Sequence, residues 1–125
     1  MPEVLECRTA PTPVVLLFDL AGSQHAADLT REVRAADPSA LVYTVDMRDP
    51  IGGARAWAGL ARTSSLRPVA AFPWAPTGPG MSLVGVATRG ILARAGIPSV
   101  VGHVPGDSSG SALAALALAR ARDGV

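Results

Sequence analysis

The chain has 125 residues, a formal net charge of +1, 49% hydrophobic residues and only 4% aromatic residues. This length fits one compact domain, and the apolar content is too high for a disordered chain. The nearly neutral charge argues against a nucleic-acid partner, because domains that bind a phosphate backbone carry a concentrated basic surplus. All 11 basic residues are arginine, which excludes Schiff-base chemistry on lysine and the lysine of a Walker-type phosphate loop.

Targeting and redox features favour a cytoplasmic protein without a membrane partner. No apolar run reaches the roughly 18 residues that indicate a membrane span. The N-terminal residues lack the basic start and the apolar run of a secretory signal. Cys7 is the single cysteine, so neither an intrachain disulfide nor a cysteine-based metal cluster is expected. We interpret residues 1–12 as an N-terminal leader and residues 13–125 as one domain.

The first predicted elements are a strand, a helix and a second strand. Residues 13–20 are almost continuously apolar, which predicts a strand buried on both faces. Ser23 follows as a helix cap, and apolar residues at helical spacing carry the helix to about Ala36. Residues 40–46 then predict a second buried strand.

The middle of the chain predicts a helix, a short strand and an irregular loop. Asp49 followed by Pro50 is a strong helix start, because aspartate accepts unpaired amide hydrogens and proline tolerates the first helical position. That helix is expected to end near Thr63. Residues 68–72 predict the third strand, and the proline-rich residues 73–80 around Trp74 predict a loop.

The last third predicts two more helices around a fourth strand. Residues 81–95 suit a helix that Gly96 ends in a left-handed cap, with a proline two residues later. Residues 99–104 predict the fourth strand and residues 111–122 the last helix. The alternation predicts a single three-layer α/β domain with a four-stranded, mainly parallel sheet and helices on both faces, Rossmann-like or flavodoxin-like.

Two aspartates lie where such a sheet binds its ligands, beyond the carboxyl ends of the strands. Asp19 ends the first strand and Asp46 ends the second. Neighbouring strands lie about 4.8 Å apart, so the two carboxylates are candidates to share a cation or to divide acid and base roles. The alternative is that each caps a helix or lies in a solvated turn.

The two histidines are further candidates. His103 lies at the end of the fourth strand, close to Asp107, and suits general acid–base work, a polar ligand contact or a purely structural role. We assign Asp19, Asp46 and His103 as candidate catalytic residues. His25 falls in the first turn of a helix, where the dipole disfavours an imidazolium, so we interpret it as an exposed residue or a ligand contact. Two isolated histidines argue against a zinc site.

Small residues after the fourth strand resemble a phosphate-binding turn, since they let backbone amides approach an anion at a helix N-terminus. Simple helix capping by the same residues is the alternative. Arg48 and Arg67 are candidates to neutralise a bound anion, with Trp74 as part of a cover. The candidate ligand-binding residues are Ser23, Arg48, Trp74, Asp107, Ser108 and Ser109.

Two functions fit these features. The first is binding of a small anionic or phosphorylated ligand at the carboxyl ends of the strands, with possible catalysis. The second is a non-catalytic accessory or assembly subunit, because Leu113, Leu116 and Leu118 do not share one face of the last helix and predict a homo-oligomer or a larger complex. The sheet can cover the stripe of Leu113, Leu116 and Ala117, so the adjacent stripe of Ala114, Leu118 and Ala121 is expected to need another chain. The alternative is that the small alanines let the helix sink into its own domain and hide both stripes. Gly-x-Gly-x-x-Gly is absent after the first strand, and no other motif identifies a cofactor.

Overall fold

The computed structural model describes residues 12–73, 79–101 and 111–123, which form four strands and four helices in strict alternation. The strands are β1 (Val14–Asp19), β2 (Leu41–Asp46), β3 (Val69–Phe72) and β4 (Ser99–Val101). The helices are α2 (Gln24–Ala36), α3 (Pro50–Thr63), α4 (Pro79–Arg94) and α5 (Ser111–Asp123). The predicted element order is confirmed.

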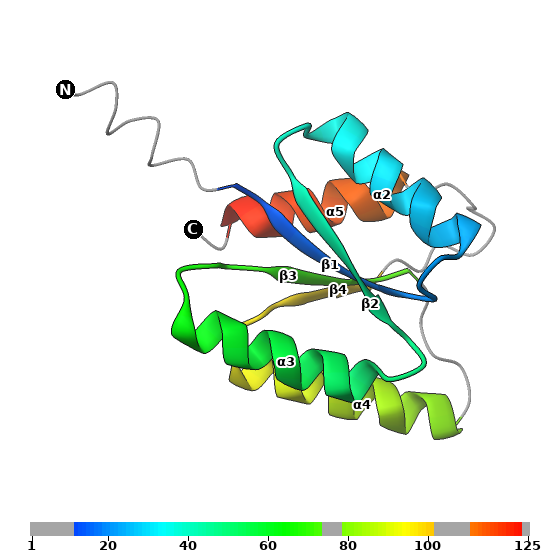
Figure 1. Ribbon diagram of the computed structural model, residues 1–125, viewed down its shortest axis with the longest axis vertical. Helices are drawn as coiled ribbons and strands as arrows, with labels where there is room; N and C mark the ends of the chain where they lie inside the picture. The colour runs from blue at the N-terminus through cyan, green and yellow to red at the C-terminus, as the bar shows by residue number, and fades with distance from the viewer. Residues whose placement is uncertain (1–11, 74–78, 102–110, 124–125) are drawn as a thin grey trace.

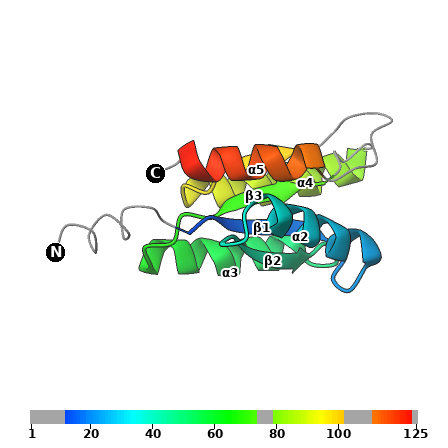
Figure 2. The same cartoon turned by 90° about the horizontal axis from the view of Figure 1, so that it is seen from above.

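The four strands form one parallel sheet in the order β2-β1-β3-β4. Helices α2 and α5 cover one face and α3 and α4 cover the other, so the three-layer α/β architecture is confirmed (Figure 1). Within its layer, α2 lies beside α5 (Figure 2). The chain leaves β1 toward one edge and leaves β3 toward the other, which places the topological switch point between these two strands.

The core is divided between the two faces of the sheet, and β1 contributes to both because successive side chains point to opposite faces. Val15 and Leu17 pack in the cluster beneath α2 and α5. Leu16 and Phe18 pack in the cluster beneath α3 and α4. Phe18 stacks on Phe72 of β3 with 4.7 Å between the ring centroids, so the two central strands are joined by an aromatic contact.

Strand β2 differs from its predicted burial. It lies at an edge of the sheet, and Leu41, Tyr43 and Thr44 are exposed. Tyr43 still contacts Trp57 of α3, with 5.1 Å between the ring centroids. The apolar sequence of β2 therefore reflects partial cover by α2 and α3 at an edge position rather than full burial on both faces.

The helix boundaries follow the predicted caps. The Ser23 hydroxyl accepts a hydrogen bond from the Ala26 amide at 3.0 Å, and the Asp49 carboxylate accepts one from the Gly52 amide at 3.1 Å. Gly96, with φ +78°, ends α4 in the left-handed region as predicted. Helix α4 begins at Pro79, two residues earlier than expected, because proline suits the first helical position.

Helix α5 buries a different face from the one expected. Leu118 is 3% exposed and lies in the core cluster beneath α2 and α5, whereas Leu116 is 52% exposed. Small alanines on the buried face let the helix approach the sheet closely, so the stripe expected to need a partner is filled within the domain. Among the side chains of α5 that the structure describes, residues 114–121, the buried ones are Ala114, Ala117, Leu118 and Ala121.

Several predicted features lie outside the described residues. The expected end of the fourth strand at residues 102–104 and most of the expected leader belong to this group. The site candidates in the group are Trp74, His103, Asp107, Ser108 and Ser109. Among the described helices, none has the length and apolar character needed to cross a membrane.

Candidate functional site

The candidate site is centred on Asp19, the last residue of β1. Strand β1 is central in the sheet, so its carboxyl end lies at the switch point beside β3. Asp19 follows the alternation of Val15 and Leu17 and therefore faces the layer of α2 and α5. Its residue surface is only 4% exposed, which makes it an unusual position for a charged side chain.

A tight turn brings the start of α2 back over Asp19. The Ser23 amide donates a hydrogen bond to the Leu20 carbonyl at 3.1 Å, which closes a four-residue turn. Gly22 occupies the third position of this turn with φ +82°, a backbone conformation that favours glycine. Ser23 then caps α2. His25 is consequently placed in the first turn of the helix, directly beside the end of β1.

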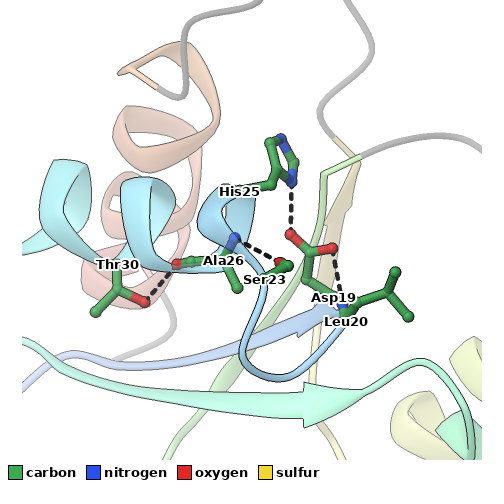
Figure 3. Close-up of polar contacts among 6 residues, drawn as sticks. All are labelled: Asp19, Leu20, Ser23, His25, Ala26 and Thr30. Carbon is green, nitrogen blue, oxygen red and sulfur yellow. Dashed lines mark hydrogen bonds and ion pairs between the residues drawn. The ribbon is translucent and has the colours of Figure 1, made fainter.

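Asp19 and His25 form a close polar pair. The Asp19 Oδ2 atom lies 2.6 Å from the His25 Nδ1 atom, and the Asp19 Oδ1 atom accepts a hydrogen bond from the Leu20 amide at 2.8 Å. The histidine side chain is 54% exposed, whereas that of the aspartate is 5% exposed. Figure 3 shows the imidazole ring above the carboxylate, with its second nitrogen turned away from Asp19. The pair thus joins a buried anion to an accessible ring.

The chemistry of this pair follows from the donors and acceptors present. An ionised carboxylate only accepts hydrogen bonds, so the His25 Nδ1 atom carries a hydrogen and donates it to Asp19. In the neutral ring, the lone pair then lies on Nε2, on the side turned away from Asp19 (Figure 3). When the ring takes up a second proton, the carboxylate offsets the new charge. This arrangement can accept a proton from, or donate one to, a molecule at the carboxyl end of β1.

Asp46 lies opposite Asp19 in the register of β1 and β2, which confirms that the two aspartates end neighbouring strands. Their carboxylates nevertheless have separate partners. Asp46 accepts a hydrogen bond from the Arg48 amide at 3.0 Å and contacts the Arg48 guanidinium at 3.4 Å. Its interactions are those of a partly exposed turn, which was the alternative assignment for this residue.

The other described candidates are placed as follows. The Ser23 hydroxyl is engaged as the cap of α2. The Arg48 side chain is exposed and lies beside Asp46. Arg67 lies two residues before β3 and therefore at the amino end of the sheet, away from Asp19. Across the described residues, no group of three or more histidine, cysteine, aspartate or glutamate side chains is placed to hold a metal ion.

The pairing of His25 with Asp19 is the feature that the sequence did not predict. The sequence alone predicts only an exposed residue or a ligand contact at His25. The available signal was local: a strand ends in aspartate, Ala21-Gly22-Ser23 forms a turn and a cap, and a histidine follows in the first helical turn. Such a turn reverses the chain within a few residues and brings the two side chains together.

Two cavities lie at the opposite, amino end of the sheet. One of about 380 Å³ is lined by the segments that enter β3 and β4 and by the end of α5. The other, of about 340 Å³, is lined by the segments that enter β1 and β3 and by Leu41. Neither of these two cavities includes Asp19 or His25, so both lie at the end of the sheet opposite to the polar pair.

Comparisons with known proteins identify no relative. No family model matches the chain, and neither a curated protein nor a solved structure gives a significant match. The fold alone defines the class of this protein, which is an α/β domain with a four-stranded parallel sheet.

Proposed function

We propose that this domain binds a small anionic or phosphorylated ligand at the carboxyl end of β1, and that His25 is its principal polar contact. The carrying observation is the 2.6 Å contact between the Asp19 Oδ2 and His25 Nδ1 atoms. It supports the proposal because it fixes the ring orientation and leaves Nε2 for a ligand. The location at a topological switch point supports the same proposal. A cytoplasmic location, expected from the sequence, belongs with it.

Asp19 acts as the positioning residue in this proposal. A protonated imidazole in the first turn of a helix is disfavoured by the positive end of the helix dipole. The buried Asp19 carboxylate, 2.6 Å from Nδ1, places a negative charge beside the ring and so offsets that effect. A ring protonated on both nitrogens can then donate from Nε2 to an anionic oxygen. If the ligand undergoes a reaction, the same ring serves as general acid or base, with the carboxylate holding the required tautomer as in other aspartate–histidine pairs.

The second candidate function is the non-catalytic accessory subunit. Leu83 is 72% exposed and Val86 is 61% exposed, and their spacing of three residues on α4 places them side by side. An apolar pair on the outside of a helix is a feature of surfaces that meet another protein. In this alternative, the Asp19–His25 contact only stabilises the turn between β1 and α2.

Nuclear magnetic resonance with inorganic phosphate and pyrophosphate as probes tests the first proposal. We expect saturable shifts of the His25 ring resonances and of the amides of residues 19–26. The His25→Gln variant should lose at least tenfold in affinity, as expected for a charge-assisted hydrogen bond worth roughly 1.5–3 kcal/mol. Asp19→Asn, which keeps the size of the side chain and removes its charge, should weaken binding in the same direction.

Ala35→Gln is the matched control, because Ala35 is exposed near the other end of the same helix. It should leave the titration unchanged. Wild-type resonances of residues 19–26 that do not respond to either anion would refute the ligand proposal. A response that is identical in wild type and His25→Gln would refute the assigned role of His25.

A further inference from the structure

The amino end of the sheet carries a second feature that the proposed function does not use. The cavity of about 380 Å³ is formed where the chain enters β3 and β4. Arg67 and Pro68 line it from the first segment, Gly96 and Pro98 from the second, and Arg120 from α5. Three separate segments therefore contribute to one hollow, and a volume of this size suits a small ligand.

The charged residues that line this cavity are all positive. Arg67 and Arg120 come from different elements, and no aspartate or glutamate is among the lining residues. In the described part of the chain, the ion pairs that arginines form involve Arg31 and Arg48, and neither cavity arginine belongs to them. Two arginines that line one cavity can supply planar guanidinium donors that match the oxygens of a carboxylate or a phosphate.

Backbone amides, rather than these arginines, donate hydrogen bonds to carbonyls at the end of α4. The final carbonyls of a helix lack partners within the helix and attract basic side chains. Here the Ile97 amide donates to the Leu92 carbonyl at 2.9 Å, and the Gly96 amide donates to the Ala93 carbonyl at 3.0 Å. The Leu92 and Ala93 carbonyls therefore have backbone partners and do not need an arginine.

The neighbouring cavity of about 340 Å³ extends the site with apolar surface. Both cavities are lined by Arg67 and Ala121, so they adjoin each other. The second cavity is also lined by Leu41 and Leu66, two leucines that the domain leaves exposed. An anionic group placed between the arginines would thus have an apolar wall next to it.

We propose that this end of the domain binds an amphipathic anion, with a carboxylate or phosphate group between Arg67 and Arg120 and an apolar chain along Leu41 and Leu66. The charged part and the apolar part of the site each match one part of the ligand. The guanidinium groups recognise the charged oxygens, and the leucines gain from covering their surface with an apolar chain. This site is separate from the one at Asp19 and His25.

Titrations of the 15N-labelled protein with octyl phosphate, octanoate, inorganic phosphate and octanol, each below its aggregation concentration, test the proposal. We expect octyl phosphate or octanoate to shift the amides of Val69, Gly96 and Ile97. Which of the two binds more tightly identifies the head group. Inorganic phosphate, which lacks the chain, and octanol, which lacks the charge, should each bind at least tenfold more weakly than the better amphipathic anion.

Variants separate the contributions of the two parts. Arg67→Gln and Arg120→Gln should each weaken binding of the amphipathic anion about tenfold, and Leu66→Gln should reduce the advantage of that anion over inorganic phosphate. Arg62→Gln and Leu60→Gln are matched controls, since both residues are exposed and line neither cavity. Both controls should bind as the wild type does.

Several results would overturn the proposal. Equal affinity for octanol would refute the role of the arginines, and equal affinity for inorganic phosphate would refute the role of the leucines. No saturable shift with any amphipathic anion would refute the site itself. Shifts confined to residues 19–26 would also refute it, while supporting the separate proposal for the carboxyl end of β1.

Discussion

The carboxylate of Asp19 and the imidazole of His25, six residues apart in the chain, are held 2.6 Å apart by the turn that joins β1 to α2. The aspartate is buried and the histidine is accessible. Removing the His25 side chain therefore has different consequences from removing the Asp19 side chain. Loss of the histidine leaves a buried carboxylate with one partner fewer, and loss of the aspartate leaves the Leu20 amide without its acceptor.

A double-mutant cycle with Asp19→Ala and His25→Ala measures this relationship. We expect Asp19→Ala to lower the free energy of unfolding by about 1–3 kcal/mol, because the Leu20 amide loses its acceptor and His25 loses its partner. The coupling energy between the two positions should be about 1 kcal/mol, reduced from a fully buried pair by the exposure of the histidine. Urea unfolding of the four proteins gives both values. Strictly additive effects would show that the contact contributes nothing to stability.

The cap of α2 is expected to be the second determinant of this site. The Ser23 hydroxyl accepts a hydrogen bond from the Ala26 amide, so Ser23→Ala should lower the free energy of unfolding by about 1 kcal/mol. Ser23→Thr keeps the hydroxyl and is the matched control. Urea unfolding should place the threonine variant near the wild type, and equal stability of the two variants would contradict the assigned cap.

Much of this fold could be predicted from local sequence signals. Apolar runs mark the strands, and the Ser23 and Asp49 caps mark the starts of two helices within one residue. The edge position of β2 could not be predicted in this way, because strand order depends on which strands pair across long separations of sequence. The apolar composition of β2 looks like that of a central strand, although an edge strand partly covered by α2 and α3 accommodates the same residues.

The position of the candidate site could be predicted from the sequence, but the residue that contacts Asp19 could not. The carboxyl end of β1 follows from the parallel sheet, which identifies Asp19 directly. The choice between Asp46 and His25 as its partner depends on a side-chain orientation set by the turn at Gly22. Likewise, the helical spacing of α5 identifies apolar stripes, but only the packed domain determines that the side bearing Leu118 faces the sheet.

Two glycines of α3 provide a contrast in packing. A Cβ atom at Gly53 would overlap the Cγ1 atom of Val45 in β2, whereas a Cβ atom at Gly59 would meet nothing within 4 Å. We expect Gly53→Ala to destabilise the protein by about 1–2 kcal/mol, because valine is too short and stiff to move aside. Gly59→Ala should instead stabilise it by up to about 1 kcal/mol through helix propensity. Thermal unfolding measures both, and equal effects would contradict the close approach of α3 to β2.

The last prediction concerns α5 and the expected self-association. Leu118 lies in the core and Leu116 is exposed, so the two positions separate folding from association. Leu118→Ala should lower the free energy of unfolding by about 2–5 kcal/mol, the usual range for a buried leucine. Leu118→Glu should unfold the domain, since it would bury a charge without a partner.

Leu116→Ala should change stability by no more than about 0.5 kcal/mol, as for other surface positions. Self-association through α5 must therefore use the side of the helix that carries Leu116. Sedimentation velocity of the wild type and Leu116→Glu tests this directly. We expect Leu116→Glu to remain folded and to move the sedimenting species toward the monomer. A wild type that is monomeric at high concentration, or a Leu116→Glu variant that associates unchanged, would show that α5 serves only the domain's own core.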